Sequence, residues 1–133
     1  MPRSNLRNRQ REHRVTANEF RALALALPDV EERSHMGHPD FRANGRIFAT
    51  LADEEAALAM AKASPEVQEA LIEGAPKVFR PCAGMWGMGG ATYVELRAAQ
   101  PSAVKRALHA AYDLVMASNP AKPRRRKSGP GGT

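Results

Sequence analysis

The sequence contains one cysteine and no long apolar run, and both absences narrow what the protein can be. Because Cys82 is the single cysteine, no internal disulfide can form, which fits a reducing compartment. Residues 1–14 contain no apolar run of the kind that a signal peptide requires. The longest apolar stretches, residues 22–27 and 56–61, are far shorter than the roughly 18–20 residues that span a bilayer. We therefore expect a cytoplasmic protein without a membrane partner.

The formal charge of +6 is confined to the two ends of the chain. Residues 1–15 carry five Arg against one Glu, and residues 117–133 carry five Lys or Arg and no acid. Residues 16–116 hold ten basic and thirteen acidic residues, so the middle of the chain is mildly acidic. The overall basicity is therefore no argument that the folded part binds phosphate.

Composition divides the chain into three regions. Residues 1–15 and 118–133 are polar, basic and without apolar periodicity, and the second is rich in Pro and Gly. Such segments bury too little surface to offset the entropy of ordering, so we expect two disordered tails. Residues 16–117 are predicted to form one domain, which is long enough to bury a core without disulfides or metal.

Helix signals are clear at several points in the middle region. Thr16 and Glu19 form a capping box ahead of apolar residues at helical spacing, and Pro28 ends that helix. Ser64 and Pro65 suit the N-cap and first turn of another helix. That helix is predicted to end at Gly74. Two further helices are predicted, from Asp53 through Lys62 and from Pro101 to about residue 117.

Strand signals lie between these helices. Asn44-Gly45 suits a two-residue hairpin turn between residues 41–43 and 46–51, because both residues tolerate positive φ. Other strands are predicted over residues 31–38, 76–81 and 92–96. The order of helices and strands predicts an α+β fold in two layers, with an antiparallel sheet and helices packed on one of its faces.

Two groups of residues invite a catalytic or metal-binding interpretation. His35 and His38 form His-x-x-His near Asp40, but two strand residues three apart point to opposite faces, and turn residues that bond the backbone explain the motif without a metal. Cys82 lacks the local signature of a catalytic cysteine and fits a small buried residue. The residues therefore predict no catalytic, cofactor or metal site, and we expect no enzyme activity.

A glycine-rich segment, residues 84–90, surrounds the single tryptophan, Trp86. It lacks the Lys-Ser/Thr of a phosphate-binding loop and does not match the dinucleotide-binding pattern. A strand, not a helix, is predicted to follow it, so no helix N-terminus would meet a phosphate. We expect a hairpin tip or irregular loop, on which Trp86 either stacks on a ligand or folds back onto the sheet edge.

Two blocks of the sequence resemble a known family. The first runs from Ser34 to Arg42 and continues from Asn44 to Leu51, and the second comprises Trp86-Gly87, residues 90–92, and Val94 with Leu96. Together with the opening helix they are similar to the MmcQ/YjbR family of small bacterial proteins, over roughly residues 16–117. The resemblance implies an α+β fold similar to that of type III secretion chaperones. It also implies DNA binding through a proposed "double wing" of hairpins, and it carries no catalytic activity over to this chain. Where many members carry Arg or Lys after the Trp-Gly pair, this chain has Met88 and Gly89.

Three functions remain open at this point, of which the third is an enzyme whose site is assembled from distant residues such as His35, His38 and Asp40 and which would require a deep pocket that joins them. The first is a DNA-binding module, non-specific and salt-dependent, whose candidate contacts are Arg42, Arg46, Lys77, Arg80 and Trp86 in the domain and Arg124, Arg125, Arg126 and Lys127 in the tail. About five tail contacts to phosphate would give a slope of log affinity against log salt near −4.5. The second is a protein- or peptide-binding module that uses Met85, Trp86 and Met88 as an adaptable apolar patch. If Trp86 lies beside Arg42 and Arg46, nucleic acid is favoured. If it lies on an uncharged concave face, a protein partner is favoured.

Overall fold

The computed structural model describes residues 14–118 as a six-stranded antiparallel sheet with helices on both faces. The two basic tails lie outside the described residues, apart from Arg14, Val15 and Ser118 at their inner ends. Val15 is buried, and its amide donates to the carbonyl oxygen of Leu96. None of the described helices is both long enough and apolar enough to span a bilayer.

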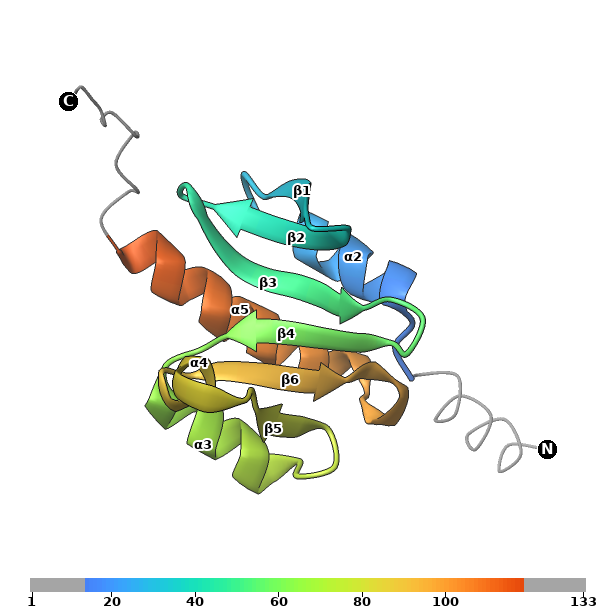
Figure 1. The fold of residues 1–133 in the computed structure, drawn as a ribbon, viewed down its shortest axis with the longest axis vertical. Helices are drawn as coiled ribbons and strands as arrows, with labels where there is room; N and C mark the ends of the chain where they lie inside the picture. The colour runs from blue at the N-terminus through green and yellow to red at the C-terminus, as the bar shows by residue number, and fades with distance from the viewer. Residues whose placement is uncertain (1–13, 119–133) are drawn as a thin grey trace.

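The elements follow one another in an order close to the predicted one (Figure 1). The helices are α2 (Ala17–Leu25), α3 (Pro65–Gly74), α4 (Gly84–Met88), a 3-10 helix (Leu96–Ala98) and α5 (Pro101–Ala117). The strands are β1 (Glu31–His35), β2 (His38–Ala43), β3 (Arg46–Asp53), β4 (Leu58–Lys62), β5 (Phe79–Pro81) and β6 (Ala91–Glu95). The strand order across the sheet is β1-β2-β3-β4-β6-β5.

Local capping and turn chemistry confirm several predictions. The Thr16 hydroxyl accepts from the Glu19 amide while the Glu19 carboxylate accepts from the Thr16 amide, so the capping box is complete. The Ser64 hydroxyl caps α3 by accepting from the Val67 amide. Asn44 and Gly45 both have positive φ and form the turn between β2 and β3.

The prediction of a helix from Asp53 through Lys62 is wrong. Asp53 ends β3, and its carboxylate accepts from the Ala56 amide in the turn that leads to β4. In β4, residues 59–61 are almost fully buried between β3 and β6. Because an alanine-rich segment lacks a distinct apolar face that could direct a helix onto the core, pairing with the two neighbouring strands outweighs its helix propensity.

Three other predicted elements differ in detail. Residues 31–38 form two strands, not one, because Met36 and Gly37 both take positive φ and turn the chain between β1 and β2. The strand predicted over residues 76–81 is limited to β5, since turn residues precede Phe79. The glycine-rich segment forms the short helix α4, not a hairpin tip or an irregular loop.

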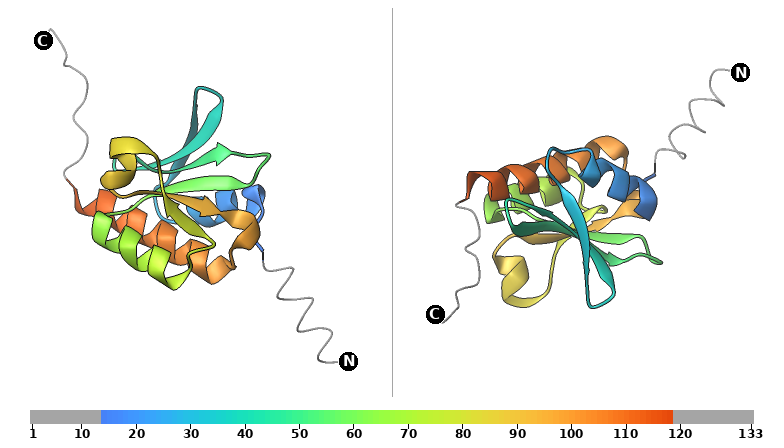
Figure 2. Two further views of the ribbon diagram at one scale, coloured as in Figure 1. Left: turned by 60° about the horizontal axis from the view of Figure 1, so that its bottom comes forward. Right: turned by 90° about the horizontal axis from the view of Figure 1, so that it is seen from above.

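The main core lies between the sheet and helices α2, α3 and α5 (Figures 1 and 2). Phe41 of β2 makes an edge contact with Phe20 of α2, and Phe48 of β3 makes one with Tyr112 of α5. A bulge at the β2–β3 pairing turns both Phe48 and Ala49 toward the helices. The same bulge pairs Arg42 with Ile47, and both of these residues face the opposite side of the sheet.

Candidate functional site

A groove runs across the face of the sheet that α2 and α5 leave uncovered. The β1–β2 hairpin and α4 both project from this face and form its two walls (Figure 2). Strands β3 and β4 supply the floor through Ile47, Thr50, Ala52 and Met60. The groove has a volume of about 810 Å³, within the range of ligand-binding clefts. Its lining residues are His35, Met36, His38, Asp40, Arg42, Gly45, Arg46, Ile47, Thr50, Ala52, Met60, Lys62, Trp86, Leu114, Val115 and Ser118.

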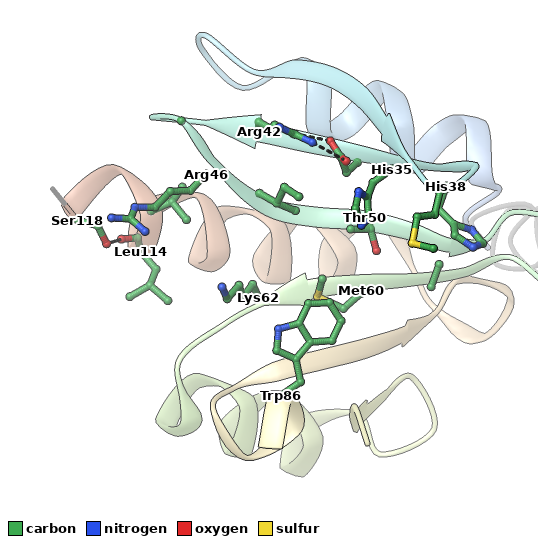
Figure 3. Close-up of a pocket in the computed structure, with 16 residues that line it drawn as sticks. His35, His38, Arg42, Arg46, Thr50, Met60, Lys62, Trp86, Leu114 and Ser118 are labelled. Carbon is green, nitrogen blue, oxygen red and sulfur yellow. Dashed lines mark hydrogen bonds and ion pairs between the residues drawn. The ribbon is translucent and has the colours of Figure 1, made fainter. Parts of the chain in front are cut away.

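Helix α4 is held in place by contacts that leave its aromatic side chain available. The buried Gln68 side chain of α3 donates to the carbonyl oxygens of Gly87 and Ala91, both at 2.9 Å. Gly87 packs against the backbone of Cys82 so closely that no side chain fits between them. Trp86 lines the groove together with the floor residue Met60, and 58% of the Trp86 surface is exposed (Figure 3). The indole is therefore accessible from the groove, and its stacking on a ligand stays a prediction.

The opposite wall carries the two histidines in an arrangement that differs from the predicted one. His35 and His38 are direct cross-strand partners at the tip of the β1–β2 hairpin, so they share one face of the sheet. The expectation that they point to opposite faces is wrong, because a two-residue turn separates them. Within residues 14–118, no group of three or more His, Cys, Asp or Glu side chains is placed to hold a metal ion.

Arg42 and Asp40 form an ion pair inside the groove. The Arg42 Nε donates to Asp40 Oδ1 at 2.9 Å and its Nη2 donates to Oδ2 at 3.1 Å (Figure 3). Asp40 is 1% exposed, whereas Arg42 reaches the groove surface. The hydrogen bonds to Asp40 raise the pKa of the Arg42 guanidinium. This pairing neutralises the one carboxylate among the lining residues.

Two further cations line the groove. Arg46 begins β3 beside the end of α5, and Lys62 ends β4 beside Trp86 (Figure 3). The Lys62 side chain forms no hydrogen bond or ion pair with any residue in the described part of the chain. Lys62 is not among the predicted contacts, because residues 53–62 are predicted as a helix and not as part of the sheet. If residues 58–62 are interpreted as a strand, the alternation of side chains places Lys62 on the same face as Met60.

The other predicted contacts lie away from the groove. Arg80 donates to Glu95 Oε2 at 2.6 Å and lies over the ring of Tyr93 at 5.1 Å from its centroid. Lys77 is exposed in the turn before β5 and does not line the groove. Arg124, Arg125, Arg126 and Lys127 lie outside the described residues. The structure therefore brings together Arg42, Arg46 and Trp86, and separates Lys77 and Arg80 from them.

Cys82 lies behind α4 and outside the groove. It is 6% exposed and packs with Met60 and Ala91. Burial raises the pKa of the Cys82 thiol to about 11, and the charge of Arg80 offsets part of that rise. The thiol is therefore protonated at neutral pH.

Comparisons with known proteins agree with this fold. A search of curated proteins found no match. The crystal structure of Deinococcus radiodurans protein DR2400, with a DUF419 domain, is similar with a TM-score of 0.68 and 20% sequence identity. The alignment covers 86% of this chain and 88% of that one, and it supports the α+β architecture. The family model named YjbR matches residues 25–114, which include the β1–β2 hairpin, the sheet and most of α5. The chain therefore belongs to the YjbR family.

Proposed function

We propose that this protein is a non-catalytic binding module that holds nucleic acid in the groove between the β1–β2 hairpin and α4. The observation that carries the proposal is that Trp86 lies in one groove with Arg42, Arg46 and Lys62. These are the two kinds of side chain that nucleic acid requires: a cation for the phosphate and an aromatic face for a base. Their presence in one concavity favours nucleic acid over an uncharged protein ligand.

The charge of the lining supports this choice. Arg42 and Asp40 neutralise each other, so Lys62 adds a positive charge to the groove although the middle of the chain is acidic overall. A phosphate entering the groove would pair with Lys62 without displacing an existing ion pair of that residue. The tail cations at residues 122–127 would add contacts that are independent of base sequence.

The proposal assigns no catalytic step to the protein. A protonated, buried thiol is a poor nucleophile, which argues against a role for Cys82. His35 and His38 form no hydrogen bond with a carboxylate among residues 14–118, so neither has the orienting partner that a general base uses.

A second candidate function is peptide binding in the same groove. Met36, which lines the groove at the hairpin tip, and Met85 and Met88 of α4, the helix that carries Trp86, are between 77% and 85% exposed. Methionine side chains adapt to varied apolar partners. This candidate predicts binding that depends on the three methionines and little on salt.

Fluorescence anisotropy of short labelled DNA across a salt series tests the proposed function. The full chain is compared with a variant in which four of the five cations of the C-terminal tail, Arg124, Arg125, Arg126 and Lys127, are changed to Gln. Each background also receives Lys62→Gln, or Lys77→Gln as a matched control outside the groove. We expect Lys62→Gln to weaken binding and to reduce the salt slope by about 0.7–0.9, and Lys77→Gln to change neither. Absence of binding at low salt, or binding lost entirely with the tail cations, would contradict a role for the groove and favour the peptide alternative.

A further inference from the structure

We infer that the groove selects unpaired strands over duplexes, with one base stacked on Trp86 and the adjacent phosphate held by Lys62. This inference rests on the proposed function and specifies its ligand. It concerns the shape of the site rather than its charge, because a duplex and a single strand present similar phosphates but very different base surfaces.

The position of Trp86 favours a free base face. The indole lines the groove together with the floor residue Met60 and with Lys62 (Figure 3). In a duplex the base faces are covered by their neighbours, and a side chain reaches them only by unstacking a step, which costs a few kcal/mol. An unpaired base has an exposed face and can enter the groove beside the indole without that cost.

The placement of charge also favours a single strand. Met36, which lines the groove at the tip of the β1–β2 hairpin, is 84% exposed and apolar, so it offers no charge to a duplex backbone. The cations Arg42, Arg46 and Lys62 line the groove between the walls, where a single backbone fits.

Lys62 is placed to hold the phosphate next to the stacked base. It ends β4 directly after the buried Ala61 and lies beside the indole, on the side toward Arg46 in the view of Figure 3. A strand stacked on Trp86 would therefore pass Lys62 and then Arg46 toward the end of α5. Stacking and phosphate contacts both tolerate any base, so we expect little sequence preference.

The inference can be tested with the full chain, because Trp86 is the one tryptophan in the sequence and its intrinsic fluorescence reports on stacking. A single strand and the duplex of the same sequence are titrated at low salt. We expect the single strand to quench Trp86 and to bind at least about tenfold more tightly than the duplex, and the duplex to leave the emission unchanged.

Variants of α4 separate stacking from charge. Binding of the labelled single strand is expected to weaken about 5- to 150-fold in Trp86→Ala, to be largely retained in Trp86→Phe, and to be unchanged in Leu25→Ala, a control at an exposed apolar residue of α2 outside the groove. Retention of the thermal unfolding midpoint in Trp86→Ala would confirm that the variant is folded. If it is not folded, Trp86→Phe with the quenching data decides.

Three results would distinguish failure of the inference from failure of the proposed function. If the duplex binds as tightly as the single strand and its binding depends on Lys62 but not on Trp86, the groove binds nucleic acid and the selection of unpaired strands is wrong. Equal binding of the single strand by Trp86→Ala and the unaltered protein would also overturn the inference. If neither form binds at low salt, the proposed function itself fails.

Discussion

Arg42 binds Asp40, two residues earlier in the same strand, through two parallel hydrogen bonds, although Asp40 is almost fully buried and Arg42 is not. Residues two apart in a strand point to the same face, so the pair forms within β2 without help from another element. The buried carboxylate of Asp40 has the Arg42 guanidinium as its counter-ion. A change at Arg42, which lines the groove, is therefore expected to lower the stability of the sheet.

This asymmetry predicts unequal effects of removing the two partners. Arg42→Gln leaves a buried carboxylate without its counter-ion, and we expect it to lower the free energy of unfolding by about 1–3 kcal/mol. Asp40→Asn removes the buried charge and leaves Arg42 able to reach solvent, so we expect a smaller loss, about 1 kcal/mol. Urea denaturation of both single variants and the double variant measures the difference. A larger loss in Asp40→Asn than in Arg42→Gln would contradict this account.

A second loss of stability is expected when Asn44, in the turn between β2 and β3, is replaced. Its side-chain amide donates to the carbonyl oxygens of Val115 at 2.8 Å and Ser118 at 3.0 Å, so it ties the hairpin to the end of α5. Asn44→Gly keeps the positive φ of the turn and loses only these bonds, and we expect a loss of about 1–2 kcal/mol. Asn44→Ala adds the strain of a left-handed Ala, about 1 kcal/mol more.

Thermal and urea unfolding of the two Asn44 variants would test this order. The comparison is informative because both variants remove the same side-chain amide and differ only in their tolerance of positive φ. Equal stability of the Gly and Ala variants would mean that the backbone of the turn relaxes, and that the bonds to α5 account for the whole effect.

The features that the sequence predicted correctly are mostly short-range. The capping box of Thr16 and Glu19, the Ser64 cap and the Asn44-Gly45 turn each depend on a side chain or backbone preference within a few residues. Such signals are visible in one segment alone, because the partner groups are fixed by sequence spacing. Residue type also makes Trp86, Arg42 and Arg46 candidate contacts, and the structure places all three along one groove, while their contact with a ligand stays a prediction.

The features that escaped prediction depend on distant neighbours. Strand β4 is alanine-rich, and its partners are β3 and β6, the latter about thirty residues away in sequence. Met36 occupies a positive-φ position that Asn or Gly usually fills, so of the two residues that turn the chain between β1 and β2 only Gly37 carries a turn signal. Helix α4 depends on Gln68, a polar residue of α3 whose burial nothing local indicates. Lys62 ends β4, so it escaped prediction as a groove residue because the pairing of β4 with β3 and β6 was not predicted.

Cys82 predicts a pH dependence that distinguishes a buried thiol from a reactive one. Because burial raises the pKa of the thiol from 9.0 to about 11, the thiolate is scarce below that pH, and at pH 8 we expect alkylation about 100-fold slower than for a free thiol. The rate should rise with pH up to about 11, since the reactive form is the deprotonated one. Arg80→Gln removes the charge that opposes this shift, so it should slow alkylation further.

Mass spectrometry of the protein after timed treatment with iodoacetamide would measure these rates. The same protein in urea serves as the control, because unfolding exposes the thiol and restores ordinary reactivity. Alkylation of the folded protein at the rate of the unfolded one at pH 8 would mean that Cys82 is accessible, and would reopen the question of its reactivity.

Substitutions of Gly87 in α4 and of its C-cap residue Gly89 are expected to have contrasting effects on stability and on the position of α4. The comparison therefore tests how the position of α4 affects binding. A Cβ built at Gly87 would lie 1.7 Å from the carbonyl oxygen of Cys82, whereas one at Gly89 meets no atom closer than 3.5 Å. The atom that Gly87 would strike is backbone and cannot rotate away, so Gly87→Ala must displace α4 and with it Trp86. We expect a loss of about 3 kcal/mol, at the upper end of overpacking effects. Gly89→Ala should leave stability unchanged or raise it by up to about 1 kcal/mol, because Gly89 already has an ordinary helical conformation.

Thermal unfolding followed by the emission maximum of Trp86 would separate the two variants. In Gly87→Ala the indole should leave its place in the groove, its emission should shift and single-strand binding should weaken, while Gly89→Ala should match the unaltered protein in stability, emission and binding. Normal binding by a Gly87→Ala variant with shifted emission would mean that the position of Trp86 over the groove floor is irrelevant to the ligand. Loss of binding together with the shift would connect the close packing of α4 on Cys82 to the function of the groove.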